Sequence, residues 1–299
     1  MKCIVTGGAG FIGSNLVDEL IKQGHQVVVI DNESASENEQ FYWNDKTENY
    51  KLDICNYEKI EPLFKDVDWV FHLAAQSRIQ PAIKNPIRTV RVNCEGTTNV
   101  LQASREHNVK KVMYSSTSSY YGLKNNIPAK EDMERDCLNP YSVTKVAGED
   151  ICKMYTKLFG VKTVIFRYFN VYGERQPIKG QYAPVIGLFQ KMKSEGKPMT
   201  VVGDGKQRRD YTHVSDVVNA NILAAENDDV GNGEVINIGT GTNYSVLDLV
   251  NMVGGEYIHI PERLGEARET LANNILAYKL LGWSPKIKLE EWMNEGYYE

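Results

Sequence analysis

Two side chains with complementary chemistry, Tyr141 and Lys145, stand four residues apart in a stretch with helical character. Residues at this spacing share one face of a helix, so the phenol and the ammonium group would lie side by side. A free tyrosine has a pKa of about 10 and is a poor base at neutral pH, but a neighbouring cation favours its phenolate. Such a phenolate could take the proton of an alcohol while a hydride leaves the same carbon. Because this spacing is common on surface helices, the pair needs further context.

A glycine-rich loop supplies that context. Residues 6–13, TGGAGFIG, separate a strand pattern at residues 3–5 from an amphipathic helix pattern at residues 11–22. In such a unit the first of three glycines spaced three apart permits a tight turn. The second lets the backbone approach a pyrophosphate, the third lets helix and strand pack closely, and the helix N-terminus binds phosphate. The order of elements favours a dinucleotide site over a turn without a ligand, and its expected contacts are Gly7, Gly10, Phe11, Ile12 and Gly13.

The end of the second expected strand, residues 27–30, favours NAD as the dinucleotide. Asp31 follows directly, and a carboxylate there accepts hydrogen bonds from ribose hydroxyls and repels a 2′-phosphate. None of the next ten residues is an arginine that would favour NADP. We expect Asn32 beside it, and Asp53 and Ile54 after the third strand, to lie near the adenosine. A turn or N-cap aspartate is the structural alternative.

Two more segments follow strands at the same expected edge of the sheet. Residues 115–119, SSTSS, come after a strand at 112–115. Because ligands bind beyond the carboxyl ends of parallel strands, one of these hydroxyls could hold the substrate oxygen beside Tyr141. A solvated polar loop is the alternative. The small residues at 73–75, after a strand at 69–73, would let the backbone approach the cofactor.

The first half of the chain alternates short apolar runs with amphipathic stretches, a pattern typical of parallel strands joined by helices. Expected strands lie at residues 3–5, 27–30, 51–54, 69–73, 112–115 and 164–166, and expected helices at 11–22, 86–107 and from Pro140 onward. After about residue 173, helices near 181–195, 214–227, 245–253 and 273–281 mix with strands near 199–202, 234–238 and 256–260.

These patterns predict an α/β protein in which a Rossmann-type doubly wound parallel sheet binds the dinucleotide. We place this NAD-binding domain at residues 1–173. A smaller mixed α/β domain for the substrate would occupy residues 174–299. The boundary is soft, and we expect some chain to cross back.

Composition narrows the function classes. The 299 residues are 42% hydrophobic and 24% charged, as in an ordinary globular protein. The net charge of −5 argues against nucleic-acid partners, which need a basic patch. Five cysteines without Cys-x-x-Cys spacing, and five scattered histidines, predict reduced thiols, no metal site and a cytoplasmic location. We expect neither a signal peptide nor a membrane-spanning segment.

Taken together, these features resemble the extended short-chain dehydrogenase/reductase family over nearly the whole chain. The segments that carry the resemblance are residues 6–13, 72–76 (HLAAQ), 115–117 (SST), 141–145 (YSVTK), 167–170 (RYFN), 203–211 (GDGKQRRDY) and 263–266 (RLGE). The later segments look like those of nucleotide-sugar enzymes, especially UDP-glucose (UDP-galactose) 4-epimerases.

The resemblance implies NAD as the cofactor, a UDP-sugar as the substrate and Thr117, Tyr141 and Lys145 as the catalytic triad. Further cofactor contacts would be Leu73, Ala74, Ala75, Gln76, Asn93, Ser115 and Tyr168. Substrate contacts would be Asn170, Arg209, Arg263 and Arg268 at the diphosphate, Tyr182, Ala183 and Val185 at the uracil, Glu266 at the ribose, and Arg78 and Thr270 at the sugar.

Departures from related patterns indicate the reaction. Related dehydratases carry Asp-Glu directly after the triad Ser/Thr, and UDP-glucuronate decarboxylases usually carry a glutamate nearby. Here the positions hold Ser118 and Ser119, so the acid/base groups of both reactions are missing. Epimerisation at sugar carbon 4 needs only the triad and NAD. We therefore expect an NAD-dependent 4-epimerase of UDP-glucose and UDP-galactose.

Two positions bear on the choice of sugar. Thr270 stands where a bulky tyrosine excludes N-acetyl sugars, so UDP-GlcNAc and UDP-GalNAc could also be accepted. Arg78, with Gln80, would line the sugar pocket and could instead recognise a carboxylate, as on UDP-glucuronate.

Three alternatives stay open: a UDP-glucuronate 4-epimerase, another nucleotide-sugar oxidoreductase, and a non-catalytic NAD-binding sensor. Such sensors often lose the tyrosine or the lysine, and this chain keeps both. A homodimer built on the helices at 86–107 and 140–160 is implied by the resemblance alone.

Overall fold

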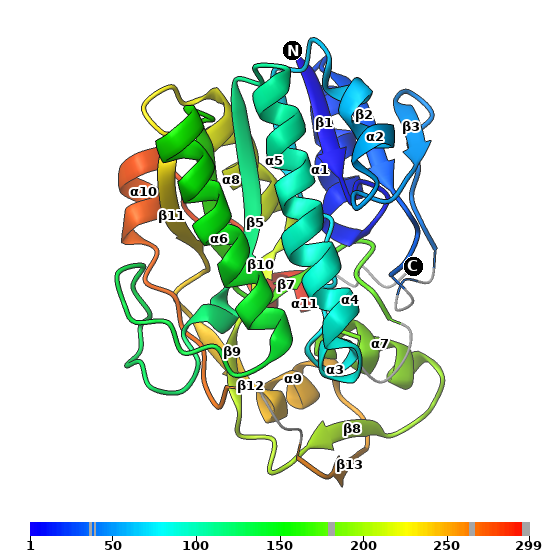
Figure 1. Cartoon of the computed structure of the whole chain (residues 1–299). Helices are drawn as coiled ribbons and strands as arrows, with labels where there is room; N and C mark the ends of the chain where they lie inside the picture. Colours follow the sequence, from blue (N-terminus) through cyan, green and yellow to red (C-terminus); the bar gives the residue numbers. More distant parts are fainter. Residues whose placement is uncertain (36–37, 39, 179–182, 263–266, 295–299) are drawn as a thin grey trace.

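A seven-stranded parallel sheet forms the centre of the computed structural model, which describes residues 1–294 except 36–37, 39, 179–182 and 263–266 (Figure 1). The strands lie in the order β11-β6-β5-β4-β1-β2-β3. Their bounds are β1 Lys2–Thr6, β2 Gln26–Asp31, β3 Glu48–Lys51, β4 Trp69–His72, β5 Lys111–Thr117, β6 Thr163–Tyr168 and β11 Asn232–Ile238. The direction of winding reverses between β1 and β4, where a doubly wound sheet opens a crevice for a ligand. This confirms the predicted Rossmann-type fold.

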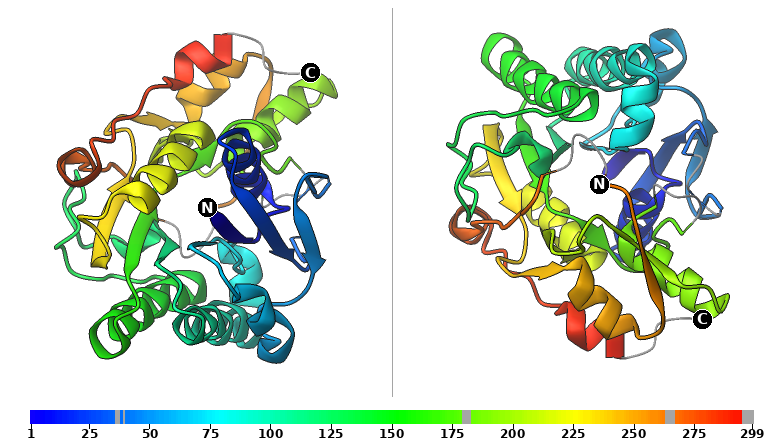
Figure 2. Two further views of the ribbon diagram at one scale, coloured as in Figure 1. Left: turned by 90° about the horizontal axis from the view of Figure 1, so that it is seen from above. Right: turned by 90° about the horizontal axis from the view of Figure 1, so that it is seen from below.

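Helices cover both faces of this sheet (Figure 2). One face packs against α1 (Phe11–Lys22), α8 (Val214–Glu226) and α10 (Ile275–Leu281), and the other against α2 (Tyr57–Ile60), α5 (Thr97–Glu106) and α6 (Pro140–Phe159). The strands are apolar along their length because both faces are buried: Cys3 and Val5 belong to the first core, and Ile4 to the second. The remaining helical segments of this half are η1 (Glu61–Phe64), α3 (Ile79–Lys84), α4 (Pro86–Val90), η2 (Arg91–Gly96) and η3 (Ser118–Tyr120).

Two elements of the first half differ from expectation. The third strand lies at 48–51 instead of 51–54, paired with β2 so that Lys51 faces Asp31. Residues 52–54 form the turn that follows, in which the Asp53 carboxylate accepts a hydrogen bond from the Cys55 N–H. The helix expected at 86–107 is interrupted by the π-helical turn η2. At the end of that turn, Gly96 lies so close to Ile54 that an added Cβ would come within 2.5 Å of its side chain.

The chain crosses back to the main sheet in its C-terminal half. The strand expected at 234–238 in the smaller domain is β11, which pairs in parallel with β6 at the edge of the main sheet. Ile236 and Ile238 of β11 enter the core that α8 and α10 share. The apolar side chains of β11 explain why this strand lies at the edge of the main sheet, because the strand extends a sheet that is already buried.

The other C-terminal elements form a second cluster, beneath the sheet in the view of Figure 1. They are α7 (Val185–Ser194), β8 (Met199–Val202), β9 (Arg208–Asp210), β12 (Asn243–Ser245), α9 (Val246–Val253), β13 (Tyr257–Ile260) and α11 (Leu289–Asn294). They have their own apolar core. The short pair β7 (Val171–Tyr172) and β10 (Thr212–His213) lies beside them. The division near residue 173 remains a proposal.

A buried histidine joins the two halves of the sheet at the point where the winding reverses. The two ring nitrogens of His72, at the end of β4, lie 2.7 Å from the Thr6 hydroxyl of β1 and 2.9 Å from the Thr97 hydroxyl of α5. This links both central strands to one covering helix.

Among the described helices, none is both long and apolar enough to cross a membrane. All five cysteines are free thiols.

Candidate active site

A cavity of about 510 Å³ lies between the carboxyl ends of the central strands and the C-terminal cluster. It brings together most of the predicted site residues. Those that line it are Gly7, Gly10, Phe11, Ile12, Gly13, Asp31, Asn32, Ile54, Leu73, Ala74, Ala75, Arg78, Ser115, Thr117, Tyr141, Lys145, Tyr168, Asn170, Ala183, Val185, Arg209 and Thr270. Asp53, Gln76, Asn93 and Arg268 are not part of this lining, and Tyr182, Arg263 and Glu266 lie outside the described residues.

The three spaced glycines meet the steric demands predicted for them. Gly7 has φ +71°, and a Cβ there would lie 2.8 Å from the Ala74 nitrogen. A Cβ on Gly13 would lie 2.2 Å from the Gly7 carbonyl oxygen, so α1 can approach the loop only without a side chain. A Cβ on Gly10 would meet nothing closer than 3.3 Å and would enter the cavity's edge. This open cradle at the N-terminus of α1 fits a dinucleotide diphosphate.

Asp31 holds the loop and lines the cavity at once. Its carboxylate, 8% exposed, accepts hydrogen bonds from the Ala9 N–H at 3.2 Å and the Glu33 N–H at 2.8 Å. Burial raises the pKa of Asp31, and these hydrogen bonds oppose that shift. Asp53 does not line the cavity itself. It accepts a hydrogen bond at 3.0 Å from the side-chain amide of Asn32, which does.

Helix α6 places the two candidate catalytic side chains. The Asn139 side chain accepts a hydrogen bond from the Ser142 N–H, and the Ser142 hydroxyl accepts one from the Asn139 N–H, which forms a capping box. Pro140 occupies the first turn, as the sequence predicts. Tyr141 therefore sits in the first turn and Lys145 one turn later, both facing the cavity.

The electrostatic setting of these two groups is specific. Lys145 is buried, with its Nζ 4.2 Å from the centre of the Tyr114 ring, and burial lowers the pKa of Lys145 to about 8. Burial raises the pKa of Tyr141, while a hydrogen bond with Thr117 and the positive charge of Arg78 act to lower it. The sequence assigns this stabilisation of the phenolate to Lys145. In the structure, Thr117 and Arg78 supply it.

Asn93 and Gln76, both expected to contact the cofactor, are joined to each other by hydrogen bonds. The Asn93 side chain is fully buried and bonds to both backbone groups of Gln76, at 2.7 and 3.1 Å, and to the Thr144 hydroxyl at 2.9 Å. This amide therefore fastens the segment after β4 to helix α6 instead of facing the cavity. Ser115 and Tyr168 do line the cavity, and the Ser115 hydroxyl donates to the Tyr168 oxygen at 3.2 Å.

The two described arginines proposed for the diphosphate differ. Arg209 lines the cavity, with Nη1 donating to the carbonyl oxygens of Arg208 at 2.9 Å and Arg268 at 3.3 Å. Arg268 instead forms an exposed two-bonded ion pair with Asp204, at 2.8 and 2.6 Å. Its guanidinium is paired with Asp204 outside the cavity lining, and its contact with the diphosphate stays a prediction.

Three lining residues escaped the sequence analysis. The amide oxygen of Gln207 and the hydroxyls of Tyr172 and Tyr211 are buried without a hydrogen-bond partner among the described residues, and all three residues line the cavity. Buried polar atoms of this kind are satisfied by a ligand or by water. The segment at 203–211 was the available signal for Gln207 and Tyr211, and Tyr172 lies two residues after the segment at 167–170. Which side chains of these segments line the cavity was not visible from the sequence. Among the described residues, no cluster of His, Cys, Asp and Glu is suited to a metal ion.

Comparison with known proteins adds to this geometry. A model of the NAD dependent epimerase/dehydratase family matches residues 3–239. A putative UDP-glucose 4-epimerase of Methanocaldococcus jannaschii is 37% identical over 297 residues, which is 96% of this chain and 94% of that protein.

Two solved structures are similar over nearly their full length. A UDP-glucose 4-epimerase of Thermotoga maritima with UDP-glucose superposes with a TM-score of 0.93 at 36% identity, covering 98% of this chain and 96% of that one. A UDP-glucuronic acid 4-epimerase of Bacillus cereus, in complex with UDP-glucuronic acid and NAD, gives 0.91 at 33% identity, covering 100% and 98%.

A substitution at Gly10 tests whether the glycine loop binds the cofactor. A Gly10→Val side chain would project into the cradle. The backbone of Gly10, with φ −82°, can accept a side chain, and the Cβ would lie 3.3 Å from the Gly7 carbonyl oxygen, a tight contact that a small shift of the loop relieves. We expect NAD affinity to fall about tenfold or more, measured by calorimetry. The free energy of unfolding of the cofactor-free protein should stay nearly the same. Unchanged affinity would contradict the assignment of this cradle.

Proposed function

This chain belongs to the NAD-dependent epimerase/dehydratase family, and we propose that it inverts carbon 4 of UDP-hexoses, interconverting UDP-glucose and UDP-galactose through a transient 4-keto sugar. The observation that carries the proposal is the meeting of Thr117, Tyr141 and Lys145 at the cavity beside the glycine loop. Ser118 and Ser119 line the same cavity where related dehydratases have carboxylates.

NAD is the cofactor of this family, and when bound it supplies the acceptor and donor of hydride. The chain's own part is to hold it. The N–H groups at the start of α1 would bind the diphosphate above Gly10, and Asp31 would accept hydrogen bonds from ribose hydroxyls.

The proton transfer falls to Tyr141. Its phenolate takes the proton of the 4-hydroxyl as hydride leaves carbon 4, which becomes a ketone. Thr117, already hydrogen-bonded to Tyr141, would hold the same sugar oxygen. When the hydride returns from bound NAD to the opposite face, Tyr141 would give the proton back to the oxygen on carbon 4, which yields the epimer. Thr117 and the charge of Arg78 favour the phenolate, and the Lys145 ammonium group could bond to the nicotinamide ribose.

Inversion requires one end of the substrate to be held and the other to turn. Arg209 and Asn170 would hold the diphosphate, and the unpartnered groups of Gln207, Tyr172 and Tyr211 are available to the nucleotide. Binding energy gained at this end can support chemistry at the sugar. Thr270, a small side chain on the cavity wall, leaves room for an N-acetyl group, so we include UDP-GlcNAc and UDP-GalNAc among the substrates.

Arg78 supports a second candidate function, the 4-epimerisation of UDP-glucuronate. This guanidinium lines the cavity and lies close enough to Tyr141 for its charge to lower the pKa of the phenol. A cation there suits a sugar carboxylate.

A panel of UDP-sugars tests the proposal. The purified protein with NAD is incubated separately with UDP-glucose, UDP-GlcNAc and UDP-glucuronate, and the products are identified by NMR. We expect the 4-epimers of the first two. Epimerisation of UDP-glucuronate alone would select the second candidate, and no turnover of any of the three would refute both.

A Tyr141→Phe variant tests the proton transfer. Loss of the phenolic oxygen should lower kcat by about 10²- to 10⁴-fold, the usual contribution of a general base. NAD and UDP affinities should stay close to those of the unmodified protein, because the ring remains. Full activity in this variant would remove Tyr141 from the mechanism.

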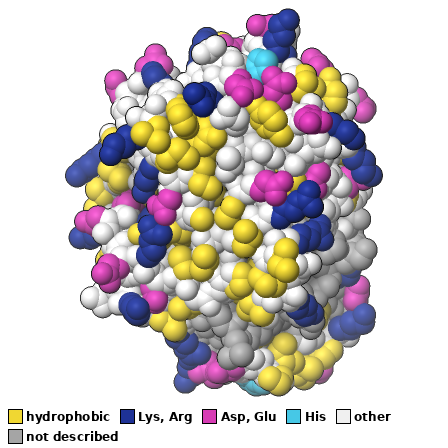
Figure 3. Space-filling model, viewed as in Figure 1, with side chains coloured by type: hydrophobic (Ala, Val, Ile, Leu, Met, Phe, Trp, Pro, Cys, Tyr) yellow, Lys and Arg dark blue, Asp and Glu magenta, His cyan; other side chains and the backbone are white. Residues whose placement is uncertain are grey.

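We further propose a homodimer in a reducing, cytoplasmic compartment, in keeping with the five free cysteines. Apolar side chains are exposed on the face that carries α4 and α6 (Figure 3). These are Ile87, 82% exposed, Val90, Val143, Met154 and Leu158, 65% exposed. Val143, Met154 and Leu158 fall on one side of α6, as helical spacing requires. Such a stripe suits a second copy of the same two helices.

Replacing Leu158 with glutamate would put a charge at the end of this stripe that lies in the last turn of α6. We expect the Leu158→Glu variant to sediment as a monomer and the unmodified protein as a dimer. Glu226→Lys, a charge change on α8 on the opposite face, is the control and should stay dimeric. A dimeric Leu158→Glu variant would place the interface elsewhere.

A further inference from the structure

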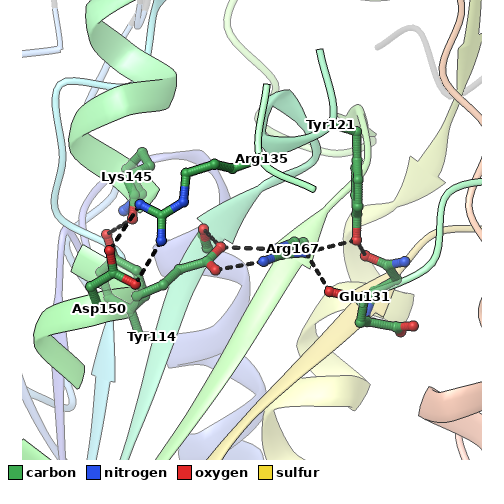
Figure 4. A network of polar contacts seen from close by, with 10 residues as sticks. Tyr114, Tyr121, Glu131, Arg135, Lys145, Asp150 and Arg167 are labelled. Carbon is green, nitrogen blue, oxygen red and sulfur yellow. Dashed lines mark hydrogen bonds and ion pairs between the residues drawn. The ribbon is translucent and has the colours of Figure 1, made fainter. Parts of the chain in front are cut away.

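A buried ion pair joins β6 to helix α6, one helical turn beyond Lys145 (Figure 4). Arg167 of β6 donates from Nε to Oε1 of Glu149 at 3.0 Å and from Nη2 to Oε2 at 2.8 Å. Both residues are 1% exposed. Glu149 follows Lys145 by one turn of α6 and Tyr141 by two, on the same side of the helix.

The same carboxylate also holds the strand that carries Thr117. The Ser116 hydroxyl donates to Oε1 of Glu149 at 2.5 Å. Ser116 stands between Ser115 and Thr117 at the end of β5, where it pairs with Arg167 in the sheet. One carboxylate thus connects α6 with both β5 and β6.

Arg167 extends the connection to the sugar end of the cavity. Its Nη1 donates to the Tyr121 hydroxyl at 3.0 Å and to the Glu131 carbonyl at 3.1 Å. Its guanidinium stacks 3.3 Å from the centre of the Tyr120 ring. Tyr120 and Tyr121 directly follow the lining residues Ser118 and Ser119. The pair therefore joins α6 to the end of β5, to β6 and to the segment that follows Ser119.

Stability alone is a poor explanation for such a pair. Removing two charges from water costs several kcal/mol per ion, and well-packed apolar replacements are often as stable. What apolar side chains cannot reproduce is the fixed, directional set of hydrogen bonds. Resting on the function proposed above, we propose that Glu149, held by Arg167, is a positioning residue that sets where α6 presents Tyr141 and Lys145 to Thr117.

Glu149 also acts on Lys145 through its charge. The ammonium group lies against the Tyr114 ring of β5, and the groups that influence its protonation or respond to it are His72 of β4, Cys94 of η2 and Cys152 and Glu149 of α6. Burial lowers the pKa of Lys145, and the negative charge of Glu149 opposes that shift. The carboxylate therefore helps to keep the ammonium protonated.

A Glu149→Gln variant separates positioning from general support. It keeps the shape, removes the charge and replaces one acceptor oxygen by an NH2 group, so that one of the two hydrogen bonds from Arg167 is lost. We expect kcat to fall about 10- to 100-fold, as for a small misplacement of reacting groups, with KM for the UDP-sugar within about threefold. The pKa of Lys145, followed by NMR of lysine-labelled protein without cofactor, should fall below its value of about 8.

The matched control is Asp150→Asn, on the next residue of α6. Asp150 pairs with Arg135 at 3.0 and 3.2 Å, and both side chains are largely exposed. This ion pair joins α6 to the same loop from outside (Figure 4). Exposed pairs contribute little, so kcat and the pKa of Lys145 should stay unchanged.

A second variant, Ser116→Ala, tests the positioning role of Glu149 if the Glu149→Gln variant does not fold. It leaves the ion pair intact and removes only the bond to β5, and we expect at least a fivefold loss of kcat. Unmodified kcat in a folded Glu149→Gln or Ser116→Ala variant overturns the positioning role. If the unmodified protein epimerises no UDP-sugar, the function proposed above fails. The titration of Lys145 still tests Glu149, because an unchanged pKa would refute its influence.

Discussion

The close contact between helix α6 and strand β5 is the constraint on which the site depends. A Cβ on Gly148 would lie 2.0 Å from the Tyr114 hydroxyl, so this turn of α6 can approach the strand only as glycine. The same hydroxyl donates to the Lys145 carbonyl at 3.0 Å, and Glu149 binds Ser116 on the next turn. Together with the capping box at Asn139, these contacts fix both the height and the rotation of the helix.

The glycine loop and the catalytic spacing could be predicted from the sequence because their chemistry is local. Gly7, Gly10 and Gly13 act within one turn, and Tyr141 and Lys145 share one helix. The strands of the first half were also recognisable, because burial on both faces leaves continuous apolar runs. The domain boundary and the cofactor and substrate contacts remain predictions, because they concern ligands and relative placement.

The placement of β11 and the hydrogen-bond partners of Arg268 and Asn93 depend on residues far away in the chain. β11 joins the main sheet through β6, which lies about seventy residues earlier, and no local pattern distinguishes it from a strand of the smaller cluster. Arg268 is held outside the cavity by Asp204, and Asn93 is committed to Gln76 and Thr144. A side chain's type and motif indicate what it can bind. They do not indicate which of several competing partners it meets first in space.

The buried His72 has a consequence for how the molecule responds to acid and base. Burial, with the nearby Lys145 charge, lowers its pKa from 6.5 to about 3, so its ring is neutral throughout the range in which cells live. A neutral imidazole has one donor and one acceptor, which matches the two threonine hydroxyls on either side of it. The hydrogen bonds that His72 makes between the two halves of the sheet therefore do not change when protons move in the adjoining cavity. Proton transfer in the cavity can therefore take place without weakening the link between β1, β4 and α5.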